Sequence, residues 1–128
     1  AVEHYLDCSW LAPECFGTSD AVIVQQGTLE IVDLKTGRGV WVKAVGNLQL
    51  LIYARAACEE FKAYGIRQVR MTIVQPPLKR TETWTMDIDD LYRLTDGMKP
   101  AAAEALRELH EGVGLRFMPG NDQCRVCC

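Results

Sequence analysis

Three side chains in the first third of the sequence have the types and the spacing of a site for a hard divalent cation. Asp33 and Lys35 are separated by one residue, so in a β-strand their side chains project from the same face. A carboxylate and an ammonium group at the end of an apolar strand are costly unless they are paired or bind a metal ion. Asp20 lies at the start of the preceding predicted strand, and a hairpin brings it near Asp33. The two carboxylates and the backbone carbonyl of Leu34 would make an oxygen site for Mg²⁺ or Mn²⁺.

The lysine beside such a cation has a chemical use of its own. Lys35 could position a water molecule and stabilise the negative charge that develops on a phosphate. Asp-x-Lys is a short pattern that occurs often by chance, however. An alternative interpretation is therefore a surface ion pair on an edge strand, and the neighbouring elements and motifs must decide between the two.

The N-terminal third favours strands. Residues 2–7 alternate with period two, and the apolar run 21–24 ends in a hairpin signal at Gln25-Gln26-Gly27. A further strand is expected at 29–35, and a short extension at 40–42. This arrangement would place the carboxylates at the ends of two adjacent strands.

A helix follows. Asn47 is a good N-cap, residues 48–64 are helix formers with apolar side chains at helical spacing, and Gly65 is a natural stop. The segment therefore predicts one amphipathic helix directly after the strand that carries Asp33.

The second half predicts two more strands and two helices. The strands are expected at 69–75 and 81–88, a short helix is expected to end at Leu94, and a longer one to cover 100–110. We summarise the order as β-β-β-α-β-β-α with a cysteine tail. The predicted class is α/β (α+β), with a mixed central sheet flanked by helices.

Three motifs taken together resemble the RecB-like branch of the PD-(D/E)xK nucleases. Gly17–Asp20 matches G-x-x-D, Asp33–Lys35 matches D/E-x-K, and Gln49–Tyr53 matches Q-x-x-x-Y on the next helix. Longer segments are similar to an uncharacterised phage and prophage family of such nucleases, at 14–20, 32–40 and 70–76. The resemblance implies a restriction-endonuclease-like core.

The resemblance also implies an activity and roles for these residues. It implies a metal-dependent deoxyribonuclease, and we expect an exonuclease in phage or prophage recombination or DNA processing. Asp20, Asp33 and the Leu34 carbonyl would bind Mg²⁺ or Mn²⁺, and Lys35 would be the catalytic lysine.

The helix residues of the third motif would complete the catalytic set. Gln49 and Tyr53 are four residues apart and share one helical face. In the family this face looks toward the site and the DNA strand. Without the other motifs, a simple pair on the helix surface would explain them equally well.

The C-terminal cysteines have the spacing of a soft-metal site. Cys124 and Cys127 resemble the start of the cysteine run that holds a [4Fe–4S] cluster in some RecB-like nucleases. Cys8 or Cys15 would be the upstream ligand. The alternative is a frayed end with free thiols.

The same resemblance suggests a division of the chain. We expect residues 1–118 to form the nuclease core without an N-terminal helix that relatives carry, and residues 119–128 to be a truncated cysteine tail.

The charge balance limits the claim of DNA binding. Fourteen Lys and Arg against 17 Asp and Glu give a net charge of −3, so any affinity for DNA must come from a local patch. Arg38 and Lys43 are the preferred DNA contacts, and Lys35, Lys79 and Arg80 are the other candidates. For Lys79 and Arg80, an ordinary solvated surface is at least as good an interpretation. The absence of a long apolar run argues against a membrane segment. We expect DNA and phage recombination proteins as partners, in the cytoplasm of a bacterial or phage-infected cell.

Two other classes of function remain open at this point. One is a catalytically silent DNA- or protein-binding module on the same fold, against which the complete Asp, Asp and Lys set argues. The other is a small zinc-binding domain built on the tail, which would leave the three motifs unexplained.

Overall fold

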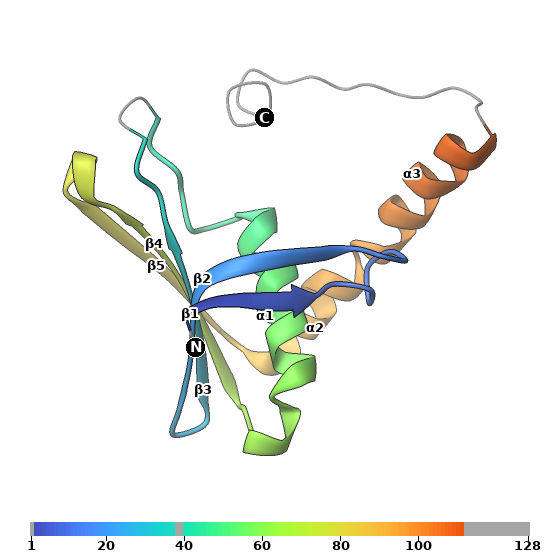
Figure 1. The fold of residues 1–128 in the computed structure, drawn as a ribbon. Coiled ribbons are helices and arrows are strands. Elements are labelled where there is room, and N and C mark those ends of the chain that lie inside the picture. Colours follow the sequence, from blue (N-terminus) through green and yellow to red (C-terminus); the bar gives the residue numbers. More distant parts are fainter. Residues whose placement is uncertain (1, 38–39, 112–128) are drawn as a thin grey trace.

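The computed structural model describes residues 2–37 and 40–111, which form one five-stranded sheet and its helices (Figure 1). The strands are β1 (Val2–Asp7), β2 (Phe16–Gln25), β3 (Thr28–Leu34), β4 (Gln68–Gln75) and β5 (Arg80–Asp87). The helices are α1 (Leu48–Glu60), α2 (Ile88–Asp96) and α3 (Lys99–Glu111), with 3₁₀ turns η1 (Lys62–Tyr64) and η2 (Pro76–Leu78). The predicted α+β class with a mixed sheet is confirmed. The two helices expected after the last strand are present as α2 and α3, separated by a turn at Gly97 and Met98, although the summary order counted a single helix there.

The strands lie in the sheet in chain order, and only one pair is parallel. Neighbouring strands are antiparallel except for β3 and β4, which run parallel with Leu34 opposite Val74. A parallel pair needs a long crossover, and α1 is part of it. Figure 1 shows α1 and α2 together on one side of the sheet. The carboxyl ends of β3 and β4 therefore meet at one edge, next to the start of the chain segment that leads into α1.

The core lies between the sheet and α1. Leu29 and Ile31 of β3 are fully buried, as are Ala54 and Ala57 of α1. Alanine carries no long side chain, so the helix can lie close to the strands. Among the described residues, no helix combines the length and the apolar character needed to cross a membrane.

The ends of α1 follow the prediction closely. Asn47 Oδ1 accepts a hydrogen bond from the backbone N–H of Leu50 at 3.2 Å, which satisfies one free amide of the first turn. The α-helical part ends at Glu60, and η1 carries the helical path to Tyr64. Gly65 then adopts a left-handed conformation with φ of 65°, where glycine has no steric penalty.

Two boundaries differ from the prediction, and both matter for the site. β2 begins at Phe16, so Asp20 lies in the middle of a ten-residue strand and not at its start. Residues 40–42 form no strand. There the amide of Gln75 takes the place of a partner strand, because it accepts from the N–H of Val42 and donates to the carbonyl of Val40, both at 2.9 Å.

A buried arginine joins α1 to α2. The Arg55 guanidinium donates to the hydroxyl of Thr95 and the carboxylate of Asp96, both at 2.9 Å. Its central carbon lies 3.8 Å from the ring centroid of Tyr92 and 5.2 Å from that of Trp10. The same guanidinium group is therefore paired with a carboxylate and in cation–π contact with two aromatic rings.

Replacing this arginine should loosen the attachment of α2. We expect Arg55→Ala to lower the free energy of unfolding by roughly 2–3 kcal/mol, because charged hydrogen bonds and cation–π contacts are lost together. Urea unfolding followed by circular dichroism measures the change. Arg93→Ala is the matched control, since Arg93 is exposed on α2 and, among the described residues, forms its ion pair with Asp90 one turn away. Its effect should stay within about 0.5 kcal/mol, and equal losses in the two variants would contradict the role of Arg55.

Candidate metal centre

The antiparallel register of β2 and β3 brings the two predicted carboxylates together. Ala21 lies opposite Val32, so the next residues outward, Asp20 and Asp33, are at the same level of the sheet. Asp33 is only 7% exposed. Burial raises the pKa of Asp33, the ion pair with Lys35 opposes this rise, and the nearby carboxylate of Asp20 adds to it. Two carboxylates thus share a small volume that favours a bound cation.

A local irregularity of β2 turns Asp20 toward β3. In a regular strand every second residue faces the same side. Gly17 and Ser19 are buried, but the next buried residue is Val22 and not Ala21, so the alternation of buried and exposed residues shifts by one position. The Ser19 hydroxyl donates to the carbonyl of Ala21 at 3.0 Å. Asp20 Oδ2 in turn accepts from the N–H of Leu34 at 2.7 Å, in place of a regular strand-to-strand hydrogen bond.

A chain of polar contacts runs from Asp33 to the first turns of α1. Lys35 Nζ lies 2.8 Å from Asp33 Oδ2 and donates to Gln49 Oε1 at 3.5 Å. Gln49 Nε2 donates to the hydroxyl of Tyr53 at 3.3 Å. The structure therefore brings together the five predicted catalytic residues, four through direct polar contacts and Asp20 through its proximity to Asp33.

Gly17 makes room for Tyr53. A Cβ atom at Gly17 would overlap Cε1, Cζ and the hydroxyl oxygen of the Tyr53 ring. The glycine of the first motif is thus needed because the tyrosine of the third motif packs against its backbone. This contact fixes the hydroxyl that accepts from Gln49.

The donor set fits a hard divalent cation with an incomplete protein shell. Among the described residues, no three His, Cys, Asp or Glu side chains gather at one point. In an extended strand the N–H and the carbonyl of one residue point to the same neighbouring strand, so the Leu34 carbonyl is on the Asp20 side of β3. Two carboxylates and one carbonyl would leave coordination positions for water or a phosphate oxygen, as is common for Mg²⁺.

The other predicted contacts fall in different places. Lys43 is exposed, with its Nζ 5.4 Å from the ring centroid of Trp41. Arg38, Cys124 and Cys127 lie outside the described residues. The predicted DNA and iron–sulfur roles of these three residues therefore stay predictions.

The cysteines considered as upstream cluster ligands lie side by side where β1 and β2 meet. The N–H of Cys8 donates to the carbonyl of Cys15 at 2.9 Å. Cys8 is fully buried, and burial, with a smaller contribution from Cys15, raises the pKa of its thiol to about 11. At this pKa the Cys8 thiol stays protonated near neutral pH in the metal-free chain.

Two polar residues at this edge had no role in the motif-based prediction. Gln75 is buried at the end of β4, and a buried amide after an apolar strand is the sequence signal that could have indicated it. Glu82 lies in the same row of the sheet as Asp33, with Ile73 between them, and its Oε2 is buried with no hydrogen-bond partner in the described part of the chain. Two strand spacings, roughly 10 Å, keep Glu82 from sharing an ion with Asp33.

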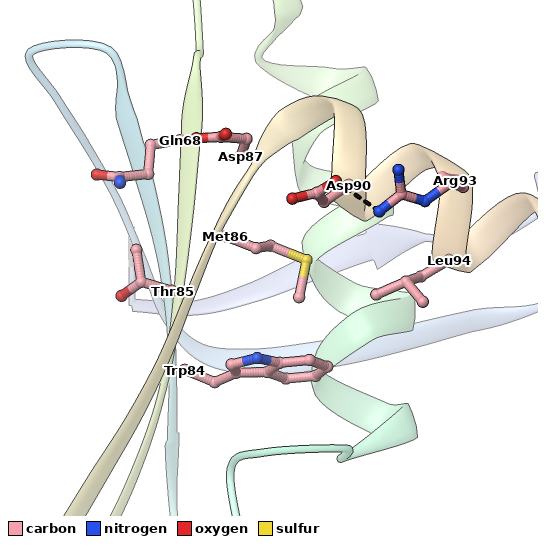
Figure 2. Close-up of a pocket in the computed structure, with 8 residues that line it drawn as sticks. All are labelled: Gln68, Trp84, Thr85, Met86, Asp87, Asp90, Arg93 and Leu94. Atoms are coloured by element: carbon pink, nitrogen blue, oxygen red, sulfur yellow. Dashed lines mark hydrogen bonds and ion pairs between the residues drawn. The ribbon is translucent and has the colours of Figure 1, made fainter.

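A separate hollow of about 480 Å³ lies at the opposite end of β4 and β5, beside α2 (Figure 2). It is lined by Gln68, Trp84, Thr85, Met86, Asp87, Asp90, Arg93 and Leu94. Two of its three charged side chains, Asp90 and Arg93, pair with each other at 2.7 Å. None of the predicted catalytic residues lines this hollow, so it is distinct from the carboxylate site.

Comparison with known families places the whole chain in one group. The family model described as "Protein of unknown function (DUF2800)" matches residues 1–128. The chain belongs to the DUF2800 family. A solved structure titled "Crystal structure of SSO0001" aligns with 99% of this DUF2800 chain and 55% of its own chain, at 15% identity and a TM-score of 0.38. The chain thus spans about half the length of that protein.

The contact between Gly17 and Tyr53 can be tested by a double-mutant cycle. Gly17→Ala should destabilise this DUF2800 chain by about 1–3 kcal/mol, because the added methyl group overpacks the site. In a Tyr53→Ala background the same change should cost much less, since the ring is gone. Urea unfolding of the four proteins gives the coupling energy. Purely additive effects would show that the two residues are not in contact.

Burial of the Asp33 carboxylate should make the metal-free protein less stable at neutral pH. Its pKa is raised on folding, so between the ordinary and the raised value only the folded state holds the proton. Stability therefore falls as pH rises through that window. Asp33→Asn should raise the melting temperature at pH 7 in the presence of a chelator, by a few degrees, and the gain should shrink as pH falls toward the ordinary pKa of aspartate.

Thermal unfolding by calorimetry measures this gain. Asp89→Asn is the control, because Asp89 is exposed in the first turn of α2, where a negative charge is favourable. It should give no stabilisation. A lower melting temperature for Asp33→Asn at pH 7 would show that the ionised carboxylate stabilises the fold.

Proposed function

We propose that this chain is a metal-dependent nuclease domain of the PD-(D/E)xK type that hydrolyses phosphodiester bonds in DNA. The observation that carries the proposal is the convergence of Asp20, Asp33 and Lys35 at one edge of the sheet. A buried carboxylate next to a second carboxylate can bind a divalent cation. A simple surface ion pair gives no reason to bury a carboxylate in this way. The low exposure of Asp33 thus argues against the simple surface pair.

Each residue of the site has a task that follows from its contacts. A bound Mg²⁺ or Mn²⁺ would act as a Lewis acid and lower the pKa of a bound water. Lys35 carries a positive charge beside the carboxylates and can stabilise charge on a phosphate. Gln49 accepts a hydrogen bond from Lys35 and so restricts where the ammonium group lies.

The helix contributes orientation to this arrangement. Tyr53 accepts from Gln49, and Gly17 fixes the position of the Tyr53 ring, so the lysine is supported from α1 as well as from β3. A preorganised ammonium group needs less rearrangement when charge develops on the substrate. The sheet order and the single parallel pair are compatible with the proposed restriction-endonuclease-like core.

The alternative of a silent binding module on the same fold predicts binding without hydrolysis. The nuclease proposal instead requires cleavage that depends on both the cation and the lysine. The predicted [4Fe–4S] cluster is independent of this choice, because neither the carboxylates nor Lys35 would take part in it.

Replacing the lysine should separate metal binding from cleavage. We expect Lys35→Ala to lower the rate of Mn²⁺-dependent DNA cleavage by about 10²-fold or more, as for the loss of one preorganised electrostatic group. Its Mn²⁺ binding, measured by calorimetry, should be nearly unchanged. Asp33→Ala should lose both cleavage and Mn²⁺ binding.

These variants also test the alternative. Wild-type cleavage rates in Lys35→Ala would remove the lysine from the mechanism. DNA binding by the wild-type chain without any cleavage in Mn²⁺ or Mg²⁺ would favour the silent module.

A further inference from the structure

An exposed tryptophan is stacked with a cation near the carboxylate site. Trp41 remains 44% exposed. The guanidinium carbon of Arg80 lies 3.9 Å from the centroid of its ring, and Lys43 Nζ lies 5.4 Å from the same centroid. We call these three residues the Trp41 platform. It combines one large aromatic surface with two positive charges.

A buried amide holds this platform in place. Gln75 is 2% exposed, and its two hydrogen bonds go to the backbone on either side of Trp41, at Val40 and Val42. Gln75 is also the strand partner of Arg80. One side chain therefore fixes the loop that carries the tryptophan directly beside the strand residue that stacks on it.

The register places the platform on the same face of the sheet as the catalytic set. Asp33, Ile73 and Glu82 form one row across β3, β4 and β5. Lys35 follows Asp33 by two residues, and its N–H donates to the carbonyl of Val74 at 2.8 Å, which continues the pairing of β3 with β4.

The next row beyond Asp33 therefore leads from the catalytic lysine to the platform. It contains Lys35, Gln75 and Arg80. Two strand spacings, roughly 10 Å, separate Lys35 from Arg80.

Several positive side chains lie at this edge, next to the row that carries the carboxylates of Asp33 and Glu82. The chain carries a net charge of −3, yet Lys35 and the platform residues Lys43 and Arg80 gather here. Next to Arg80, Lys79 is exposed in the turn between β4 and β5. Such a local group of cations with an exposed ring is typical of surfaces that follow a nucleic-acid strand.

We propose that the Trp41 platform binds one unpaired DNA strand, with a base stacked on Trp41 and its phosphates near Lys43 and Arg80. This inference rests on the proposed nuclease function for its substrate class. A base inside a duplex presents only its edges, whereas an unpaired base presents the flat face that stacks on an aromatic ring. At about 3.4 Å per stacked nucleotide, roughly 10 Å corresponds to about three nucleotides between the platform and Lys35.

Direct binding measurements without a divalent cation test the platform independently of catalysis. The probe is a fluorescently labelled twelve-nucleotide oligothymidine, compared with a duplex of the same length, and anisotropy is measured in EDTA. We expect Trp41→Leu to weaken binding of the single strand about tenfold, and Trp41→Phe to weaken it much less, because phenylalanine keeps an aromatic face.

A matched pair of arginines tests the location. Arg80→Ala should weaken binding of the single strand several-fold. Arg67→Ala should not, because Arg67 is exposed just before β4, at the opposite end of the sheet. Circular dichroism melting of every variant verifies that the fold is kept, and Trp41→Phe remains informative if Trp41→Leu melts early.

The outcomes separate this inference from the proposed function. Equal affinity of wild type and Trp41→Leu, equal losses in Arg80→Ala and Arg67→Ala, or preference of the wild type for duplex would each overturn the platform, even if Mn²⁺-dependent cleavage is observed. Loss of single-strand binding in Trp41→Leu without any cleavage by the wild type would support the platform and refute the nuclease.

Discussion

Parallel pairing of β3 with β4 is the constraint on which the rest of this structure depends. Two strands that run in the same direction must be joined by a crossover, and here α1 forms its regular part. The crossover places the N-terminal turn of α1, with Gln49, beside the end of β3, where Lys35 emerges. The same pairing aligns the ends of β3 and β4, so Gln75 lies next to the lysine.

The buried carboxylate of Asp33 at this edge lowers the stability of the fold. The core around Leu29 and Ile31 is apolar and closely covered by α1, but the same strand continues into Asp33, whose carboxylate is buried beside that of Asp20. Lys35 offsets part of this cost through an ion pair at 2.8 Å. A buried carboxylate with a raised pKa is the kind of feature that marks a candidate functional site, since perturbed pKa values gather where chemistry takes place.

Polar side chains that replace backbone partners give this edge its shape. Asp20 accepts the N–H of Leu34, and Gln75 bonds the backbone on both sides of Trp41. In each case a side chain satisfies groups that a regular strand would have paired. The edge therefore keeps an open, polar surface without leaving these backbone groups unpaired.

The sequence by itself determined the elements and the residues of the candidate site. Periodicity and capping residues located β1, β3, α1, β4 and β5 to within a few residues, because local sterics and burial of one face act over short stretches. The spacing of Asp33 and Lys35 placed both on one face of a strand, and that of Gln49 and Tyr53 placed both on one face of a helix, for the same reason. These relations need no knowledge of the distant chain.

Tertiary structure alone decided how these faces meet. The shift within β2 that directs Asp20 toward Leu34 depends on the register with β3, and the need for glycine at position 17 depends on where the ring of Tyr53 comes to lie. Residues 40–42 were predicted as a short strand extension, but a single buried amide, Gln75, took the place of a partner strand. Such contacts join residues far apart in the chain. They are set by the packing of α1 and the pairing of β4, which local sequence patterns do not encode.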